Sequence, residues 1–314
     1  MTNTNNNEQI LTPKLILKNH SLKDLNSWRV ATTAQYFAAP ATEEELKEVW
    51  HWAWKCKLRS YFISGGSNIL FTKDEVKGVV ISLHELKGII SVQSTETISI
   101  QCWAGTPKSE IAKIFIQNRL PPAVFITGIP GDMGGGVVMN AGIGENRTPR
   151  EFCEIVYEIE VLRLNELTGE FSHHNILGRD IKWEYRHSSG WQPGIITKVT
   201  VHWPHVADMS VHEGVKNQTQ KRVKTQPLNL PSCGSVFRNP LGHKSAQLIE
   251  RCGLKGYRVG GACVSEKHAN FIVNDRGATA QDICAIIKHV RATVLDQAGV
   301  ELKTEVVFLD DVQT

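Results

Sequence analysis

The chain has 314 residues, which is more than one ordinary hydrophobic core accommodates, so two or three domains are expected. Its apolar content of 41% and charged content of 21% are typical of a soluble globular protein. The formal net charge of +3 is small for this length and gives no case for nucleic acid or a membrane surface as the main partner.

Cysteine usage and the chain start indicate a reducing compartment. The seven cysteines are scattered, odd in number and form no Cys-x-x-Cys pair, which favours free thiols over a disulfide framework and indicates no metal site. Residues 1–9 lack the apolar core of a signal peptide, and no apolar run approaches membrane-spanning length. We therefore expect a disordered tail at 1–9, a cytoplasmic location and no membrane partner.

The first predicted elements mix strands with one helix. A short strand is expected after residues 11–22 and another at the end of residues 29–39. Thr42 and Glu45 predict a capping box, and apolar residues follow it at helical spacing. These apolar residues are Leu46, Val49, Trp50, Ala53 and Trp54.

Residues 61–63 predict a strand that ends in a glycine-containing turn. The turn reads Ser64-Gly65-Gly66-Ser67-Asn68. Backbone N–H groups at a strand end, together with hydroxyl and amide groups, suit a pyrophosphate. A plain turn is the commoner explanation of a single Gly-Gly pair, so both interpretations stay open at this point.

The middle of the chain contains a glycine-rich segment at residues 128–144. Strands are predicted at 79–81 and 97–103, and Thr106-Pro107 predicts the start of a helix that runs to about residue 118. Because glycine tolerates positive φ and has no Cβ, the backbone of 128–144 can turn sharply and approach a flat or anionic ligand. Neither dinucleotide nor P-loop spacing fits, and composition alone supports a connecting loop as well as a ligand cradle.

The last third contains a polar stretch followed by further helices and strands. Residues 155–164 and 194–203 are strand-like, and the polar, basic residues 208–224 are interpreted as a boundary or linker. The remaining predicted elements are helices at 244–252 and 279–298 and strands at 271–273 and 305–309.

Several short pieces of the chain follow one another in a specific order. They are Ser64 to Asn68, Gly128-Ile129-Pro130-Gly131 with Gly134-Gly135 and Asn140-Ala141-Gly142, Tyr185-Arg186-His187-Ser188, residues 231–240, 253–261 and 264–274, and Glu305-Val306. In this collinear order they resemble the UDP-N-acetylenolpyruvoylglucosamine reductases, also called UDP-N-acetylmuramate dehydrogenases, which are flavoenzymes of bacterial peptidoglycan precursor synthesis. One piece alone would be weak, but the set covers nearly the whole chain.

The resemblance implies an α+β fold with a two-part FAD-binding domain of the vanillyl-alcohol-oxidase (PCMH) type and a smaller α+β substrate-binding domain. It divides the chain into a first FAD-binding subdomain at 10–83, joined by a returning strand at 304–314, a second at 84–207 and a substrate-binding domain at 208–303. It also implies two loops around FAD. Their residues are Ser64, Gly65, Gly66, Ser67, Asn68, Gly128, Ile129, Pro130, Gly131, Gly134, Gly135, Asn140, Ala141 and Gly142.

The same resemblance implies the reaction. NADPH delivers hydride to FAD and leaves, and UDP-N-acetylglucosamine enolpyruvate then takes its place and is reduced to UDP-N-acetylmuramate. Arg186 matches the arginine that grips the substrate carboxylate, Ser235 the proton donor, and Glu305 the glutamate that acts beside Arg186. If Glu305 donates a hydrogen bond to a negative centre, it must be protonated, which requires a raised pKa.

Further residues are expected to bind the sugar nucleotide. They are Arg238, Asn239, Lys255 and His268, with Tyr185 orienting nicotinamide or substrate. Taken alone, Arg186 would be a surface ion pair and His268 a structural histidine. A monomer or a weak oligomer is expected.

Three departures or omissions distinguish the chain from the family pattern. The short route from Lys224 to Cys233 resembles the second type of the family, which lacks the substrate-capping loop, so no tyrosine lid is expected. Val30-Ala31-Thr32-Thr33 stands where the family has a Gly-Gly pair, and side chains there are expected to crowd the backbone near FAD. Residues 143–147 replace an Ala-Tyr-Gly ending, so an aromatic contact to FAD is expected to be missing.

Two alternatives to the reductase remain on sequence grounds. An FAD-linked oxidase could use the same fold, although residues 64–68 contain no histidine for covalent flavin attachment and the oxidase leaves Ser235 and Glu305 unexplained. A non-catalytic flavin-binding or UDP-sugar-binding protein is compatible with the departures. An NADPH consumption assay distinguishes the three.

Overall fold

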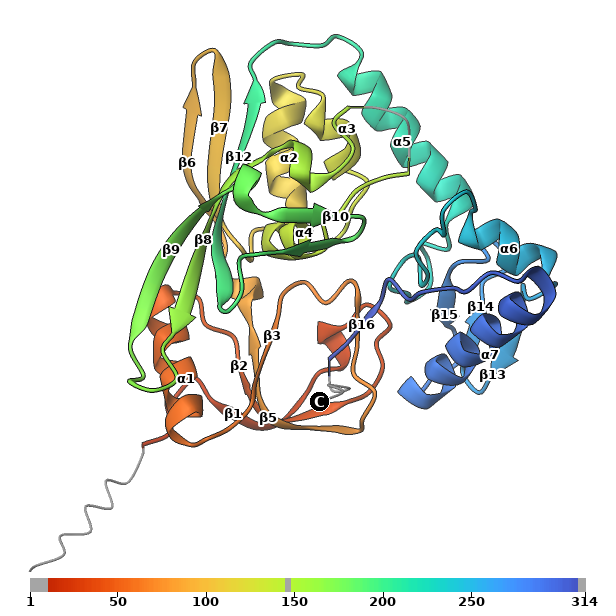
Figure 1. The fold of residues 1–314 in the computed structure, drawn as a ribbon, viewed down its shortest axis with the longest axis horizontal. Coiled ribbons are helices and arrows are strands. Elements are labelled where there is room, and N and C mark those ends of the chain that lie inside the picture. Colours follow the sequence, from red (N-terminus) through yellow and green to blue (C-terminus); the bar gives the residue numbers. More distant parts are fainter. Residues whose placement is uncertain (1–10, 145–147, 310–314) are drawn as a thin grey trace, which may run out of the picture.

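The computed structural model describes residues 11–144 and 148–309. The predicted tail at 1–9, residues 145–147 and the end of the returning strand 304–314 therefore lie outside the described residues. In Figure 1, a first unit of strands and helices (red to orange) lies below a second one (yellow to green), and the C-terminal part of the chain (blue) forms a smaller third unit. In the described part of the chain, no helix combines the length and apolar character that a membrane crossing needs.

The first unit is a four-stranded sheet with one helix. Its strands run in the order β1 (Leu17–Ser21), β2 (Thr33–Ala38), β5 (Glu75–Ser82) and β3 (Ser60–Ile63), with β2 and β3 parallel to β5. The predicted capping box is confirmed at the start of α1 (Glu43–Lys55), where Thr42 Oγ1 accepts from the Glu45 N–H. The apolar face of α1 packs on the sheet.

The second unit is a five-stranded antiparallel sheet covered by short helices. Its strand order is β6 (Ile89–Ser94), β7 (Thr97–Trp103), β12 (Ile195–Pro204), β8 (Val156–Leu164) and β9 (Phe171–Leu177). The helices α2 (Lys108–Gln117), α3 (Pro122–Ile126) and α4 (Met133–Val138) bury their apolar residues against the central strands. The alternation predicted at 97–103 is confirmed, because every second residue of β7 is buried.

A two-stranded hairpin projects from the second unit. It consists of β10 (Lys182–Glu184) and β11 (His187–Ser189). The turn between the strands carries Tyr185 and Arg186, and Arg186 has a φ of 59°. Four short 3-10 helices complete the two units, at Lys23–Leu25, Leu83–Glu85, Phe152–Glu154 and Gly178–Asp180.

The C-terminal unit follows a long helix. That helix, α5 (Val211–Thr225), runs from the helices of the second unit toward the C-terminal unit (Figure 1). Next come α6 (Ser245–Arg251), the small sheet β13 (Arg258–Val259), β14 (Ala262–Val264) and β15 (Ile272–Asn274), and α7 (Ala280–Ala298). The chain then returns to the first unit, where β16 (Val307–Phe308) pairs in parallel with β4 (Ile69–Leu70).

Three sequence expectations differ from the observed elements. Residues 208–224, interpreted as a linker, contain the helix α5, which packs Gly214 against Val124. The strand expected at 305–309 is limited to Val307–Phe308. Part of the expected glycine loop is helical, because α4 occupies Met133–Val138. The boundaries assigned to the domains stay a prediction.

Candidate active site

Arg186 holds a central position in the candidate active site. Its Nε donates to Oε1 of Glu305 at 3.1 Å, and its Nη2 donates to the Gly142 carbonyl oxygen at 2.7 Å. The guanidinium carbon lies 4.8 Å from the ring centre of Tyr185. The side chain is only 10% exposed, so these contacts are sheltered from solvent and fix the guanidinium more firmly than a surface ion pair would.

Among the described residues, three buried arginine nitrogens lack a hydrogen bond, and two of them, on Arg186 and Arg238, belong to predicted site residues. Nη1 of Arg186 has none, although Oε1 of Glu151 lies 3.7 Å away, and Nε of Arg238 has none either. A buried N–H group without an acceptor costs free energy unless a ligand supplies the acceptor. Both nitrogens therefore fit a ligand that brings oxygen atoms to this site.

The backbone of Glu305 is fixed from two sides. Its N–H donates to the Val236 carbonyl at 2.8 Å, and its own carbonyl accepts from Nδ2 of Asn68 at 2.9 Å. Burial raises the pKa of the Glu305 carboxyl, while the charges of Arg186 and Arg238 oppose that rise. The raised pKa is the direction that a protonated, hydrogen-bond-donating glutamate requires.

Ser235 directly precedes Val236, whose carbonyl oxygen accepts a hydrogen bond from the Glu305 N–H. The serine is half-buried, and Val236 after it donates to the Asn270 carbonyl and accepts from the Glu305 N–H. The structure thus brings the 231–240 segment, the Arg186 turn and the Glu305 segment to one place, although they are far apart in the sequence. The catalytic roles of Arg186, Ser235 and Glu305 stay predictions.

The predicted substrate residues fall into two groups. In the first, Nδ2 of Asn239 donates to the hydroxyl of Tyr185, the residue before Arg186, at 3.4 Å. The charge of Arg238 acts on Glu305, the ion-pair partner of Arg186, so both residues lie near the Arg186–Glu305 pair. In the second, Lys255 donates to Glu250 at 2.6 Å. Burial lowers the pKa of His268; the charge of Lys255 acts in the same direction, and that of Glu250 opposes it.

The two predicted cofactor loops lie against each other. A Cβ on Gly65 would be 3.0 Å from Cα of Gly131, and a Cβ on Gly131 would be 2.7 Å from Oγ of Ser67. Gly66, with a φ of 60°, passes the Leu25 carbonyl so closely that any side chain would collide with it. The glycines therefore permit this contact between the loops, and the exposed Gly65 leaves backbone uncovered for a cofactor.

Several glycines of the second loop serve packing rather than turning. In α4, a Cβ on Gly134 would be 2.8 Å from that of Ala104, whereas Gly135 has open space. A Cβ on Gly142 would lie 2.6 Å from the Arg150 carbonyl oxygen and from Cγ of Glu151, and 3.2 Å from Nη1 of Arg186, so this glycine makes room for the neighbouring chain and for the guanidinium. Asn140 is buried, and its Nδ2 donates to the Glu184 carbonyl at 3.0 Å, which ties the loop to the Arg186 hairpin.

The other predicted cofactor residues adjoin these contacts. Ser64 donates to Oδ2 of Asp132 at 2.6 Å, and Ala141 is buried. Gly128 faces the α5 side chain of Gln218, 3.4 Å from the site of a Cβ. Ile129 and Pro130 line a cavity beside the loops.

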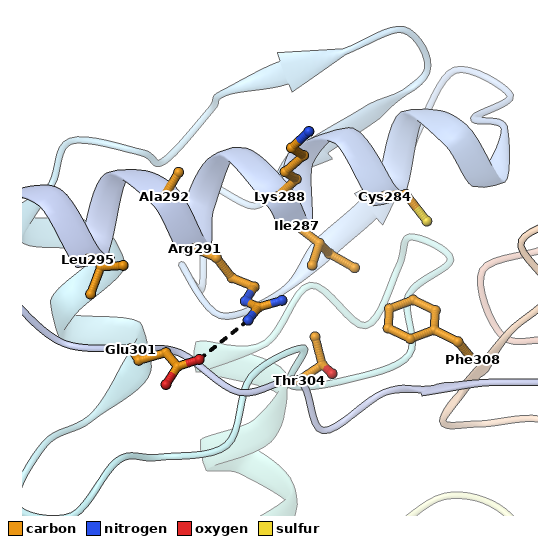
Figure 2. Close-up of a pocket in the computed structure, with 9 residues that line it drawn as sticks. All are labelled: Cys284, Ile287, Lys288, Arg291, Ala292, Leu295, Glu301, Thr304 and Phe308. Atoms are coloured by element: carbon orange, nitrogen blue, oxygen red, sulfur yellow. Dashed lines mark ion pairs between the residues drawn. The ribbon is translucent and has the colours of Figure 1, made fainter. Parts of the chain in front are cut away.

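Two cavities have different relations to this site. One of about 400 Å³ lies between α7 and the C-terminal segment (Figure 2) and contains none of the predicted site residues. Arg291 and Glu301, which both line this cavity, form an ion pair at 3.6 Å. The other, of about 270 Å³, lies at the two glycine loops and is lined by residues of both.

Sequence reasoning missed four residues near the loops and Arg186. Glu151 approaches Arg186, His84 and Lys108 lie beside the glycine loops, and Asp132 lies within the second loop. None belongs to a pattern that assigns it a role, because the partners of each are brought to it by tertiary packing. Glu151 is paired with Gly142 through an isolated β-bridge, which is not visible from spacing.

The Val30 to Thr33 departure is accommodated locally. Oγ1 of buried Thr32 donates to the Lys73 carbonyl at 3.1 Å, and Asn26 brackets the Val30 backbone with two hydrogen bonds. At the second departure, the Ile143 N–H donates to the Arg150 carbonyl at 3.0 Å, and residues 145–147 lie outside the described residues. The effects of both departures on FAD stay predictions.

A third group of titratable side chains is a network of ion pairs. Glu43 on α1 faces His173 on β9 at 3.1 Å, and His173 faces Glu160 on β8 at 3.4 Å. Lysine ammonium groups occupy the space beside both carboxylates, since Lys47 lies 2.5 Å from Glu43 and Lys198 lies 3.0 Å from Glu160. The lysines neutralise the charge that would attract a cation, so the cluster joins the first two units as a salt-bridge network.

Comparison with known proteins identifies the family. Residues 226–309 match the family model described as the C-terminal domain of UDP-N-acetylenolpyruvoylglucosamine reductase, and residues 34–166 match an FAD-binding domain. UDP-N-acetylenolpyruvoylglucosamine reductase of Synechococcus elongatus is 36% identical over 295 residues, covering 93% of this chain and 94% of the relative. The chain belongs to the UDP-N-acetylenolpyruvoylglucosamine reductase family.

Other relatives and a solved structure agree with this membership. The UDP-N-acetylenolpyruvoylglucosamine reductase of Nitrosospira multiformis is 37% identical, with 91% of this chain and 86% of the relative covered. The crystal structure of the Thermus caldophilus reductase superposes with a TM-score of 0.71 at 27% identity, covering 93% of this chain and 97% of the other. The resemblance and the α+β fold with an FAD-binding domain are confirmed, and family membership favours the reductase over the oxidase and the non-catalytic binding protein.

Proposed function

We propose that this chain is a cytoplasmic, NADPH-dependent UDP-N-acetylenolpyruvoylglucosamine reductase that converts UDP-N-acetylglucosamine enolpyruvate into UDP-N-acetylmuramate. One observation supports the active site above all. Arg186 and Glu305 meet at 3.1 Å where the Arg186 hairpin, the Asn68 loop and the C-terminal segment converge, and Nη1 of Arg186 is left without an acceptor. Reduction of an enol ether bonded to a carboxylate needs a cation that stabilises the negative charge on the carboxylate side and an acid that protonates the carbon next to the carboxylate.

FAD fits the two loops, because their glycines let the loops pack directly against each other, the exposed Gly65 leaves backbone open to a ligand, and the FAD-binding family model spans both loops. When bound, FAD supplies hydride chemistry between NADPH and the enolpyruvyl group. The residues expected to hold it are Ser64, Gly65, Gly66, Ser67, Asn68, Gly128, Ile129, Pro130, Gly131, Gly134, Gly135, Asn140, Ala141 and Gly142.

Arg186 binds and orients the substrate carboxylate. Its Nε and Nη2 are already engaged by Glu305 and Gly142, so Nη1 is the nitrogen that remains for a carboxylate oxygen. As negative charge builds on the carboxylate side of the enol ether, a fixed guanidinium stabilises it without reorganising. Such preorganised donors are typically worth about 3–4 kcal/mol each.

Glu305 acts beside Arg186 as a hydrogen-bond donor. A carboxylate would repel the developing enolate, whereas a carboxylic acid stabilises it. Burial raises the pKa of Glu305 and thereby favours the acid form, against the pull of Arg186 and Arg238. Glu305 therefore works best when its carboxyl holds a proton.

Ser235 delivers the proton to the carbon next to the acid. A serine hydroxyl is a weak acid in water, but a carbanionic enolate is a strong base, so position and driving force replace a matched pKa. Arg238, Asn239 and Tyr185 hold the sugar nucleotide near this centre. Lys255 and His268 bind it from the second group of residues.

Replacement of Ser235 tests the proposal by separating two half-reactions. Ser235→Ala should leave flavin reduction by NADPH nearly intact and should slow reoxidation by the enolpyruvyl substrate by about 10²–10⁴-fold, because only the second step needs the proton. Stopped-flow absorbance at the flavin band measures both steps.

Ser232→Ala is the matched control, since Ser232 is a half-buried serine in the same segment. It should leave both half-reactions near wild type. An equal loss in both half-reactions of Ser235→Ala would make Ser235 a structural residue. A protein that oxidises NADPH only with oxygen and releases peroxide would be an oxidase instead.

A further inference from the structure

The smaller cavity joins both glycine loops inside the FAD-binding domain. It is lined by Gly65, His84, Pro107, Ser109, Ile129, Pro130, Gly131 and Asp132. All of these residues lie within the 34–166 match to an FAD-binding domain. At about 270 Å³, with glycine and proline backbone and no Phe, Tyr or Trp in its wall, the cavity suits the compact diphosphate of FAD better than its flavin ring system.

The wall of this cavity contains a buried anion. The Asp132 side chain is 2% exposed, and its Oδ2 accepts from Oγ of Ser64 at 2.6 Å and pairs with Nδ1 of His84 at 2.8 Å. A carboxylate beside a diphosphate is repulsive, and the repulsion is strong where water is excluded. Binding of the diphosphate therefore requires cations next to Asp132.

Two basic side chains lie close enough to supply this compensation. Lys108 is buried behind the loop, where its Nζ donates to the Pro130 carbonyl at 2.8 Å and lies 3.5 Å from the site of a Cβ on Gly131. Burial lowers the pKa of Lys108 to about 8, and Asp132 opposes that fall. Lys108 thus offsets Asp132 from behind, while His84 lies in the cavity wall itself.

We propose that His84 binds the diphosphate of FAD and that Asp132 is the residue that positions it. Nδ1 of His84 is engaged by Asp132, and Nε2 makes no hydrogen bond or ion pair with the described residues. The His84 side chain is 42% exposed, so Nε2 is open to a phosphate oxygen. An imidazolium donates from both nitrogens at once and so bridges the two anions.

The surroundings of His84 agree with this role. Besides Asp132 and the buried Lys108 behind the loop, the charged residues next to His84 in its own segment are Glu85 and Lys87, which form an ion pair with each other at 2.9 Å. Because that pair is mutually neutralised, Asp132 is the dominant partner of the imidazole. None of the predicted cofactor residues carries a positive charge, so His84 would supply a charge that both glycine loops lack.

A double-mutant cycle on FAD binding tests the proposal. The variants are His84→Gln, Asp132→Asn and the double variant, and the readout is the FAD dissociation constant, measured as fluorescence of flavin released when the holoenzyme is diluted. His84→Gln should raise the dissociation constant about 10–100-fold, as expected for the loss of a charge-assisted hydrogen bond. It should also flatten the increase of the dissociation constant with NaCl concentration.

The sign of the Asp132 effect is the decisive outcome. In the wild-type background, Asp132→Asn should weaken FAD binding because His84 loses its anchor. In the His84→Gln background the same change should tighten binding, because it removes a carboxylate that has lost its imidazole partner and repels the diphosphate. His84→Lys, which keeps a cation, should bind FAD more tightly than His84→Gln.

His174→Gln provides the matched control, since His174 is a half-buried histidine on the edge strand β9. Its FAD dissociation constant should equal that of wild type. Wild-type affinity in His84→Gln would overturn the proposal, as would an Asp132→Asn effect of equal sign and size in both backgrounds. Because no substrate is present, these outcomes are independent of the roles proposed for Ser235 and Glu305.

Discussion

Glu305 is subject to two opposing influences at the scale of a single residue. Burial disfavours its charged form and raises its pKa, whereas Arg186 at 3.1 Å and Arg238 favour the charge. The net rise means that the carboxyl holds its proton to higher pH than an ordinary glutamate. Glu305 donates a hydrogen bond only while its carboxyl is protonated. Its donor function is therefore present below its pKa and is lost as the pH rises through that pKa.

This sign gives a pH prediction for the substrate half-reaction. In the wild type, reoxidation of the flavin by substrate should slow as the pH rises through the Glu305 pKa, which lies above the ordinary value of 4.5. Glu305→Gln keeps a hydrogen-bond donor that does not titrate, so this limb should disappear from its pH–rate profile while the maximal rate falls. Stopped-flow measurements across pH give both profiles, and an unchanged limb in the variant would assign it to another group.

The candidate site could be predicted only where family resemblance marked its residues. Nothing in the local sequence shows that Arg186 and Glu305 meet, because 118 residues separate them and the contact depends on the returning C-terminal segment. Glu151 and His84 were missed for the same reason. A single histidine or glutamate carries no pattern, and the neighbour that gives it a role is distant in sequence.

At the scale of elements, α4 combines two kinds of glycine in adjacent positions. Gly134→Ala would place a methyl group 2.8 Å from the Ala104 Cβ, whereas Gly135→Ala meets nothing within 4 Å. We expect Gly134→Ala to lower the free energy of unfolding by about 1–3 kcal/mol through overpacking. Gly135→Ala should raise it by up to about 1 kcal/mol, because alanine favours the helix.

Urea unfolding of the FAD-free proteins measures both free energies, and FAD titration of the same samples adds a second comparison. If the open space at Gly135 belongs to the cofactor, Gly135→Ala should bind FAD more weakly even though its fold is more stable. Equal stability of the two variants would show that Ala104 gives way without cost.

Element prediction succeeded where the sequence pattern agreed with burial. The alternation of 97–103 and the capping box at Thr42 both determined their elements. β9 was missed because this edge strand is largely exposed and lacks alternation. α5 was missed because only Val211 and Gln218 of its residues are buried, so its sequence shows no apolar stripe, and the contacts of Gly214 and Gln218 with the second unit replace one.

At the scale of the whole molecule, the C-terminal unit shares its core with the first unit. Trp28, Val30 and Leu70 belong to the same buried cluster as Ile283, Ile286 and other residues of α7. Nε1 of Trp28 donates to the Ile272 carbonyl at 2.7 Å, and the Trp28 carbonyl accepts from Nδ2 of Asn274 at 2.8 Å. A junction built from core residues couples the units more tightly than a polar interface between domains would.

This shared core predicts that the first and C-terminal units unfold together. Calorimetry of the wild-type protein should show one transition for both. Trp28→Ala should separate them, because it removes a fully buried indole and leaves the Ile272 carbonyl facing a cavity. The expected loss is about 3–5 kcal/mol. Trp54→Ala, which removes a half-buried indole bonded to Glu166 in the second unit, should lower the transition temperature less and should leave the single transition intact. Two separate transitions in the wild type would show that the units are independent, and the Arg186–Glu305 contact would then depend on ligands rather than on the shared core.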